Sequence, residues 1–120
     1  MKVAITSSGK DLTSEVDPRF GRAAYFIIID PETMENEVVA NTQNLNLAQG
    51  AGIQAGKTIV DNNVDVVITG NCGPKAFRVL QSANIKTITG VSGRIVDVIA
   101  RFKDGTLQAA QQPNVEGHWV

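Results

Sequence analysis

The sequence predicts a single α/β domain built on a mixed five-stranded sheet, in which one strand runs antiparallel to the other four. Two patterns and the length support this prediction. The first part of the chain is rich in short β-branched runs, and the second part alternates such runs with segments of helical periodicity. A chain of 120 residues can bury one core but is too short for two ordinary domains.

The first part predicts three strands. Residues 2–6 form a short one. Residues 23–30 contain the run Tyr25-Phe26-Ile27-Ile28-Ile29, which is typical of a buried central strand. The next residues, Asp30-Pro31-Glu32-Thr33, favour a turn, so we expect residues 37–42 to form a hairpin with the preceding strand.

The second part predicts three helices, where apolar residues recur at helical spacing. The first has its apolar residues from Ile53 to Val60 and ends at Asn62-Asn63. The second begins at Pro74, and the third is expected to follow an N-cap at Ser92 and to end at Gly105. Two strands, residues 65–69 and 85–89, lie between them. Residues 1–107 are thus predicted to form the domain, and polar residues 108–120 a loosely held tail.

Composition narrows the classes of function. Apolar residues make up 42% of the chain and charged residues 19%, which is typical of soluble globular proteins. The net charge is −1 and no basic run occurs, which argues against nucleic acid as the main partner. No apolar run approaches the roughly 20 residues that span a bilayer, and no signal peptide is expected. A single cysteine excludes an internal disulfide. We expect a cytoplasmic monomer.

Glycine-bearing loops are expected to meet at one edge of the sheet. Right-handed crossovers make the last strands parallel, and ligands of open α/β sheets bind beyond the carboxyl ends of such strands. Three of these loops open helices, whose N-termini offer unpaired N–H groups and partial positive charge. Together with Arg19 and Arg22, this edge suits a compact anion. The four loops are Asp17-Pro18-Arg19-Phe20-Gly21-Arg22, Gly50-Ala51-Gly52, Gly70-Asn71-Cys72-Gly73-Pro74 and Gly90-Val91-Ser92-Gly93.

Four motifs resemble those of the nitrogenase iron–molybdenum-cofactor biosynthesis family. They span residues 1–107 in the family's order, and the chain is most similar to the small stand-alone members of the orange-protein type. The motifs are Met1 to Ser8 with Val16-Asp17-Pro18-Arg19-Phe20-Gly21-Arg22-Ala23, then Gly50-Ala51-Gly52-Ile53, Gly73-Pro74-Lys75-Ala76-Phe77 and Gly105-Thr106-Leu107.

The resemblance implies a ribonuclease-H-like three-layer fold with helices on both faces of the sheet. It also implies noncovalent binding of an anionic molybdenum-containing sulfide cluster, with either copper or iron, and donor or acceptor proteins as partners. We expect a non-enzymatic carrier with no catalytic residue. The expected lining residues are Arg19, Phe20, Gly21, Arg22, Gly50, Gly52, Ile53, Gly70, Asn71, Cys72, Gly73, Pro74 and Gly93.

For several side chains, a functional and a structural interpretation both remain open. Cys72 is either a metal-binding thiolate near a helix N-terminus or a small core residue. The two arginines either hold the anion or pair with acidic residues to fasten their loop, the candidates being Asp11, Glu15 and Asp17. Lys75 either neutralises the anion or is a solvated first-turn lysine, and His118-Trp119 either caps the site or is a frayed end.

One departure from the family concerns direct metal ligation. Several members have histidine just before the Gly-Ala-Gly motif, where this chain has Gln49, which leaves His118 as the only histidine. Enclosure of a preformed cluster is therefore favoured over coordination by protein side chains.

The same residues bear on three other classes of function. A two-metal nuclease needs carboxylates on the central strands, and residues 2–6 and 66–69 carry none. A regulatory module that senses a phosphorylated metabolite or nucleotide through the same loops stays open, although no standard nucleotide-binding motif occurs. A pure interaction domain would leave the convergent glycines unexplained.

Overall fold

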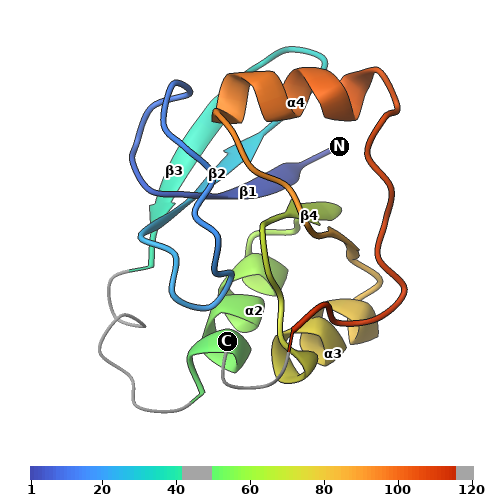
Figure 1. Cartoon of the computed structure of the whole chain (residues 1–120). Coiled ribbons are helices and arrows are strands. Elements are labelled where there is room, and N and C mark those ends of the chain that lie inside the picture. Colours follow the sequence, from blue (N-terminus) through green and yellow to red (C-terminus); the bar gives the residue numbers. More distant parts are fainter. Residues whose placement is uncertain (42–49, 116–120) are drawn as a thin grey trace.

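The computed structural model describes residues 1–41 and 50–115. All five predicted strands and three predicted helices form (Figure 1). The strands are β1 (Val3–Ser7), β2 (Tyr25–Ile29), β3 (Asn36–Ala40), β4 (Val66–Ile68) and β5 (Lys86–Ile88). The helices are α2 (Ala51–Asp61), α3 (Pro74–Ser82) and α4 (Ile95–Lys103).

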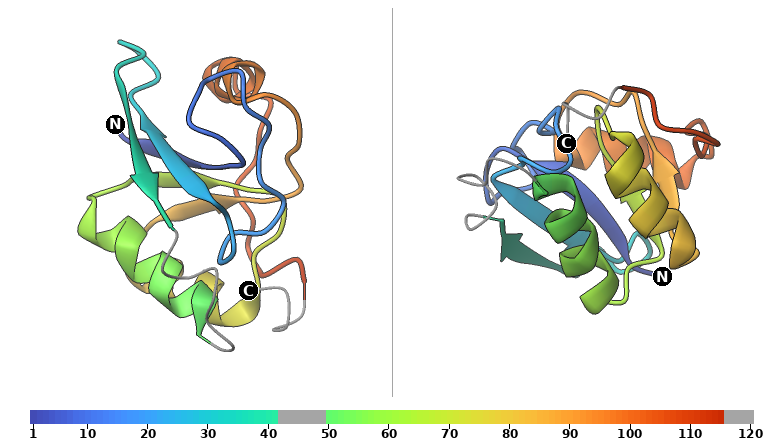
Figure 2. Two further views of the ribbon diagram at one scale, coloured as in Figure 1. Left: turned by 90° about the vertical axis from the view of Figure 1, so that its left-hand side faces the viewer. Right: turned by 90° about the horizontal axis from the view of Figure 1, so that it is seen from below.

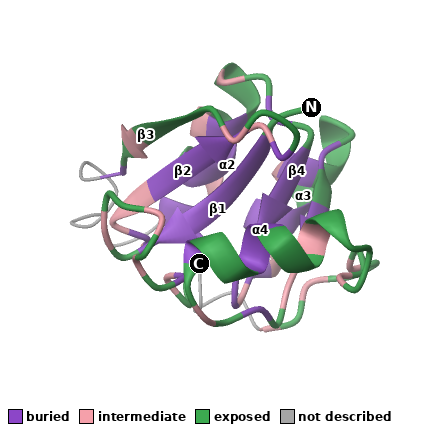
Figure 3. Cartoon of the chain, turned by 90° about the horizontal axis from the view of Figure 1, so that it is seen from above, coloured by how far each residue is buried: buried purple, intermediate pink, exposed green. Residues whose placement is uncertain are grey.

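The strands form one mixed sheet in the order β3-β2-β1-β4-β5. Strand β2 is antiparallel to both of its neighbours, whereas β1 pairs in parallel with β4 and β4 with β5. The predicted strand directions are therefore confirmed. Strand β1 is the middle strand, and the sheet is buried except along β3, whose residues are mostly exposed (Figure 3).

Helices cover both faces of the sheet in a three-layer arrangement (Figure 2). Alternate strand residues point to opposite faces, so Ala4 and Ile28 join one core cluster while Val3 and Ile27 join the other. Helices α2 and α3 pack on the first cluster, and α4 packs on the second. In the described part of the chain, no helix is long and apolar enough to cross a membrane.

The predicted start of the last helix is wrong. Helix α4 begins at Ile95 with Arg94 as N-cap, because Gly93 takes a left-handed φ of 110° that interrupts the helical path after Ser92. The carbonyl oxygen of Ser92 instead accepts a 2.7 Å hydrogen bond from Arg101 Nη2.

The described part of the tail is anchored and not loosely held. Leu107 packs on the α4-side core cluster, and the Ala110 N–H donates a 2.7 Å hydrogen bond to the carbonyl oxygen of Thr87 in β5. The tail therefore runs across the molecule to the loop after β4, where Asn114 docks.

Candidate functional site

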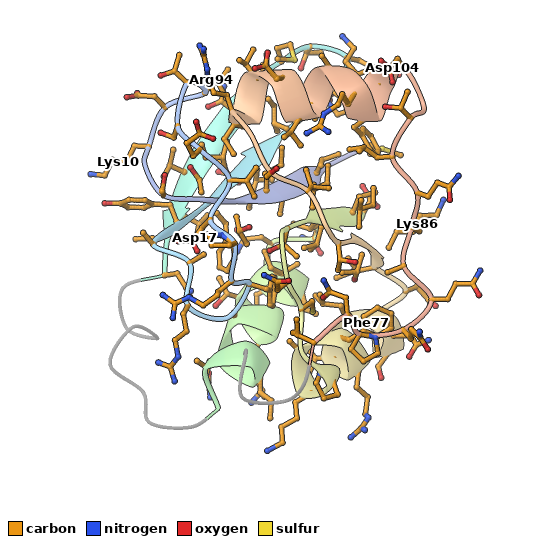
Figure 4. The ribbon with its side chains drawn as sticks, viewed as in Figure 1. Lys10, Asp17, Phe77, Lys86, Arg94 and Asp104 are labelled. Atoms are coloured by element: carbon orange, nitrogen blue, oxygen red, sulfur yellow. The ribbon has the colours of Figure 1, made fainter. Side chains whose placement is uncertain are left out.

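The loop that carries both arginines is fastened by the carboxylate of Asp17 (Figure 4). Asp17 Oδ1 accepts a 3.1 Å hydrogen bond from the Arg19 N–H, and Oδ2 accepts one of 3.3 Å from the Ala24 N–H. The Thr6 hydroxyl, at the end of β1, donates to the carbonyl oxygen of Asp17 at 2.8 Å. Asp17 thus fixes the loop through backbone groups.

Two asparagines hold this loop from opposite sides. The Asn71 side chain, after β4, donates to the Pro18 carbonyl oxygen at 3.0 Å, and the backbone carbonyl oxygen of Asn71 accepts from the Phe20 N–H at 3.1 Å. The buried Asn41, after β3, donates through Nδ2 to the carbonyl oxygens of Gly21 and Ala23. The loops after β1, β3 and β4 therefore meet, as the topology predicted. The sequence analysis missed Asn41. The feature that could have identified it is a polar residue directly after a predicted strand.

Gly70 lies where the loop after β4 crosses the arginine loop at Pro18. A Cβ atom at this position would lie 2.9 Å from both the Cα atom and the carbonyl oxygen of Pro18. Since both neighbours are backbone atoms, a side chain here would force the arginine loop to move. The absence of a side chain at Gly70 is thus explained by protein packing rather than by contact with a ligand.

Phe20 anchors the loop in the core and does not line an open surface. Its side chain is fully buried, and its ring centroid lies 5.7 Å from that of Phe26 on β2. The expected role of Phe20 in the lining is therefore corrected. Its neighbours Arg19, which is exposed, and Arg22, which is half-buried, keep their place at this edge.

The helix N-termini differ in whether the protein itself occupies them. At α4, the N–H groups of Ile95 and Val96 donate to the carbonyl oxygens of Ser14 and Leu12, both at 2.9 Å. At α2 and α3, no side chain in the described ranges forms a cap. The first-turn N–H groups there find no acceptor among the residues that the structure describes; they belong to Gly52, Ile53, Lys75 and Ala76.

Gly93 belongs to the opposite side of the sheet from α2 and α3. It precedes α4, which lies on the other side of the sheet from α2 and α3 (Figure 1). Its carbonyl oxygen accepts a 2.8 Å hydrogen bond from the Val16 N–H. Its expected place with the other glycines is corrected, because the loop after β1 has two halves. The half at Val16 pairs with the start of α4, and the half at Arg19 pairs with Asn71.

The other expected lining residues lie at the start of α2 and α3. Gly50 is the N-cap of α2 with a φ of 79°, and a Cβ atom there would meet no atom of the described residues within 4 Å. The buried Gly52 follows in the first turn. Gly73 is the N-cap of α3, and Pro74 is its first residue. Ile53 and Lys75, from the two first turns, line one groove of about 640 Å³ between the helices. This edge thus combines open N–H groups with the positive charge of Lys75 and of the arginine loop.

Cys72 is a core residue. Its side chain is fully buried, and burial raises the pKa of the thiol to about 12. A thiol with this pKa stays protonated near neutral pH, whereas metal ligation requires the thiolate. Its backbone N–H is also used, since it donates to Asn114 Oδ1 at 2.8 Å. These observations favour the core interpretation over metal ligation.

Burial of Cys72 predicts a dependence of stability on pH. The pKa of about 12 in the folded state exceeds the ordinary value of 9.0, so ionisation of this thiol in the unfolded chain destabilises the protein as pH rises above 9. Below pH 9 the thiol is protonated in both states, so its burial does not lower the free energy of unfolding there. The free energy of unfolding of wild type, relative to that of Cys72→Ala, should fall by about 1 kcal/mol between pH 8 and pH 10. Urea unfolding of both proteins measures it, and a constant difference would contradict the burial of this thiol.

Asn114, which the sequence analysis did not single out, clamps the loop after β4. Besides accepting from Cys72, its side chain donates through Nδ2 to the carbonyl oxygen of Gly70 and to Asn71 Oδ1, both at 3.2 Å. Its own N–H donates to the carbonyl oxygen of Cys72 at 3.3 Å. An asparagine in a polar tail gives no periodic signal, so only the structure reveals this contact.

Removal of this clamp should loosen the site loop. In Asn114→Ala the Cys72 N–H loses its acceptor, so its hydrogen–deuterium exchange should accelerate and the free energy of unfolding should fall by about 1–2 kcal/mol. The matched variant Asn114→Asp keeps an acceptor for Cys72 but loses both donors, and it should protect the amide better than alanine does. NMR-detected exchange measures both, and unchanged protection in the alanine variant would contradict the clamp.

Direct ligation of a metal ion finds no support in residues 1–41 and 50–115, where no group of three or more His, Cys, Asp or Glu side chains could hold one. The predictions for Gln49, His118 and Trp119 lie outside the described residues.

Comparison with known proteins agrees with this structure. The family model described as "Dinitrogenase iron-molybdenum cofactor" matches residues 1–105. The apo form of the orange protein from Desulfovibrio gigas, known from a high-resolution structure, is 40% identical, with a TM-score of 0.93, and the match covers 95% of this chain and 96% of that one. A Thermotoga protein of the DUF35 family is 38% identical, with a TM-score of 0.82 and coverage of 97% and 98%.

A further relative is known from sequence. An uncharacterized protein of Methanocaldococcus jannaschii is 30% identical over 111 residues, which is 90% of either chain. The motifs, the sheet order and these matches agree: the chain belongs to the dinitrogenase iron–molybdenum cofactor family.

Proposed function

We propose that this protein is a non-enzymatic carrier of an anionic molybdenum-containing metal–sulfur cluster. The cluster is its cargo, either a molybdenum–copper sulfide or a species like the iron–molybdenum cofactor. Membership of the family supports this cargo, as does the similarity to the orange protein. The cluster would lie at the starts of α2 and α3, beside Arg19 and Arg22.

The observation that carries the proposal is the contrast between the three helix N-termini. Loop carbonyl oxygens occupy the first turn of α4, whereas the first turns of α2 and α3 have no acceptor among the described residues. Open N–H groups at a helix N-terminus bind anions, and cluster sulfides are weak, diffuse acceptors that suit many modest contacts. The arginine loop beside them, fixed by Asp17, Asn41 and Asn71, adds charge in a set position.

The binding mode that we propose is noncovalent enclosure. Cys72 is buried and protonated at neutral pH, and the part of the chain that the structure describes holds no cluster of metal ligands. We also propose that the protein catalyses no reaction. The carboxyl ends of β1 and β4 carry the hydroxyls of Thr6 and Thr69, which contact each other at 2.9 Å, where a nuclease would need carboxylates. A cytoplasmic monomer with a ribonuclease-H-like fold remains our prediction.

An anaerobic titration tests this function. The purified protein is mixed with tetrathiomolybdate, alone or with copper(I) or iron(II), and is desalted before visible spectroscopy and metal analysis. We expect a defined charge-transfer spectrum and stoichiometric molybdenum after desalting. Loss of all metal under every condition would contradict the carrier function. Saturable binding of inorganic phosphate or a nucleotide to the same amides would then favour the sensor of phosphorylated metabolites.

Substitution of the cysteine separates enclosure from ligation. The variant Cys72→Ser should retain the same amount of molybdenum after desalting as wild type, because the thiol is turned into the core and supplies no metal ligand. Metal analysis and the charge-transfer spectrum provide the readout. Loss of metal from a variant that still unfolds cooperatively would instead assign a ligand role to the thiolate.

A further inference from the structure

A groove between α2 and α3 begins at the proposed site and extends along both helices beyond it. We call it the α2–α3 groove; its volume is about 640 Å³. Ile53, Val60 and Val79 supply its apolar lining. The helices come close because α2 has glycine at position 56, where a Cβ atom would lie 2.8 Å from Val79 Cγ1. Figure 2 shows the two helices side by side on the outer face of the molecule.

The charge on this groove is strongly one-sided. Three exposed basic side chains line it, Lys57 from α2 and Lys75 and Arg78 from α3, against the single carboxylate of Asp61. The whole chain carries a net charge of −1, so this is a local concentration of positive charge. An apolar strip between basic side chains complements a ligand that is both apolar and acidic.

We propose that the α2–α3 groove is the docking site for an acidic amphipathic helix of a partner protein. Along α2 the groove is lined at positions 53, 57 and 60, a repeat that places these side chains on one face over about 10 Å. A helix in such a groove would insert apolar side chains at a matching i, i+4, i+7 spacing. Its glutamates or aspartates would lie opposite Lys57, Lys75 and Arg78.

The groove also reaches the edge where we propose that the cluster binds. Ile53 and Lys75 belong to the first turns of α2 and α3, whose N–H groups form that edge. A helix bound here would therefore hold its parent protein next to the cargo. This use in cluster transfer rests on the proposed function, whereas docking of the helix does not require a cluster.

The test uses the full chain without cluster and a synthetic 16-residue peptide with leucines at i, i+4, i+7 and i+11 and mostly glutamates elsewhere. We expect saturable binding by fluorescence anisotropy, with NMR shift changes confined to α2 and α3. The variant with Lys57→Glu and Arg78→Glu should bind about tenfold more weakly. The matched variant with Lys86→Glu and Lys103→Glu has the same net charge and should bind like wild type.

A peptide of the same composition, scrambled to break the leucine stripe, should bind at least tenfold more weakly. Equal binding of both peptides, equal weakening by both double variants, or no saturable binding would overturn the proposal. So would binding to vesicles of anionic phospholipid with no binding of the peptide, because the occupant would then be a lipid surface. Since no cluster is present, each result is independent of the carrier function.

Discussion

Replacing Gly70 with alanine is expected to lower the free energy of unfolding by about 2–3 kcal/mol. The new methyl group would lie 2.9 Å from the backbone of Pro18, which cannot rotate away as a side-chain end could. The arginine loop must move, and its hydrogen bonds to Asn71 are strained with it. We therefore expect a second effect, a displacement of Arg19 that weakens cluster retention.

Gly90 provides the matched control for this substitution. It has a left-handed φ of 75°, and in the described part of the chain a Cβ atom would meet nothing within 4 Å, so Gly90→Ala should cost only about 1 kcal/mol of backbone strain. Urea unfolding gives both free energies, and amide shifts report whether residues 17–20 move. Equal costs for the two variants, with no shift changes in the loop of Gly70→Ala, would show that this crossing tolerates a side chain.

The double variant Arg19→Ala with Arg22→Ala should bind the cluster about 10- to 100-fold more weakly. Two charge-assisted contacts to the cargo are lost, while the fastening of the loop through Asp17, Asn41 and Asn71 remains. Unfolding should stay cooperative. Retention is measured as molybdenum per protein after desalting at a series of protein concentrations.

The control for the arginine pair is the variant with Lys86→Ala and Lys103→Ala, which removes the same charge from β5 and α4. It should retain the cluster as wild type does. Unchanged retention in the arginine variant would mean that these side chains serve only the loop. A similar loss in both variants would point to net charge instead of a local site.

Periodic patterns predicted most of the fold, because strands and helices leave a regular apolar signal. The strand directions followed from the hairpin turn at Asp30 and from the right-handed crossovers. The start of α4 was predicted wrongly. Ser92 has the residue type of an N-cap, but the left-handed φ of Gly93, which delays the helix to Ile95, leaves no trace in the apolar pattern of the sequence. The anchored tail was missed for a similar reason, since its contacts through Leu107, the Ala110 N–H and Asn114 form no periodic pattern.

The sequence predicted the sheet edge at which the candidate site lies, but not every residue that lines it. Topology brings Arg19, Asn71 and the starts of α2 and α3 to the same edge, and the sequence order is enough to infer this. Which side of the sheet each loop serves depends on three-dimensional packing, so Gly93 was placed with the wrong partners. Burial of Phe20 and Cys72 likewise depends on contacts that no local pattern encodes.

A map of amide shift changes on cluster binding tests the central claim most directly. Uniformly ¹⁵N-labelled protein is loaded anaerobically with tetrathiomolybdate and copper(I), desalted, and compared with the unloaded protein by two-dimensional NMR. We predict the largest changes at the amides of Gly52, Ile53, Lys75 and Ala76 and in residues 17–22, with little change at the start of α4. Stable loading with its largest changes at Ile95 and Val96, or on β2 and β3, would contradict the site that we propose.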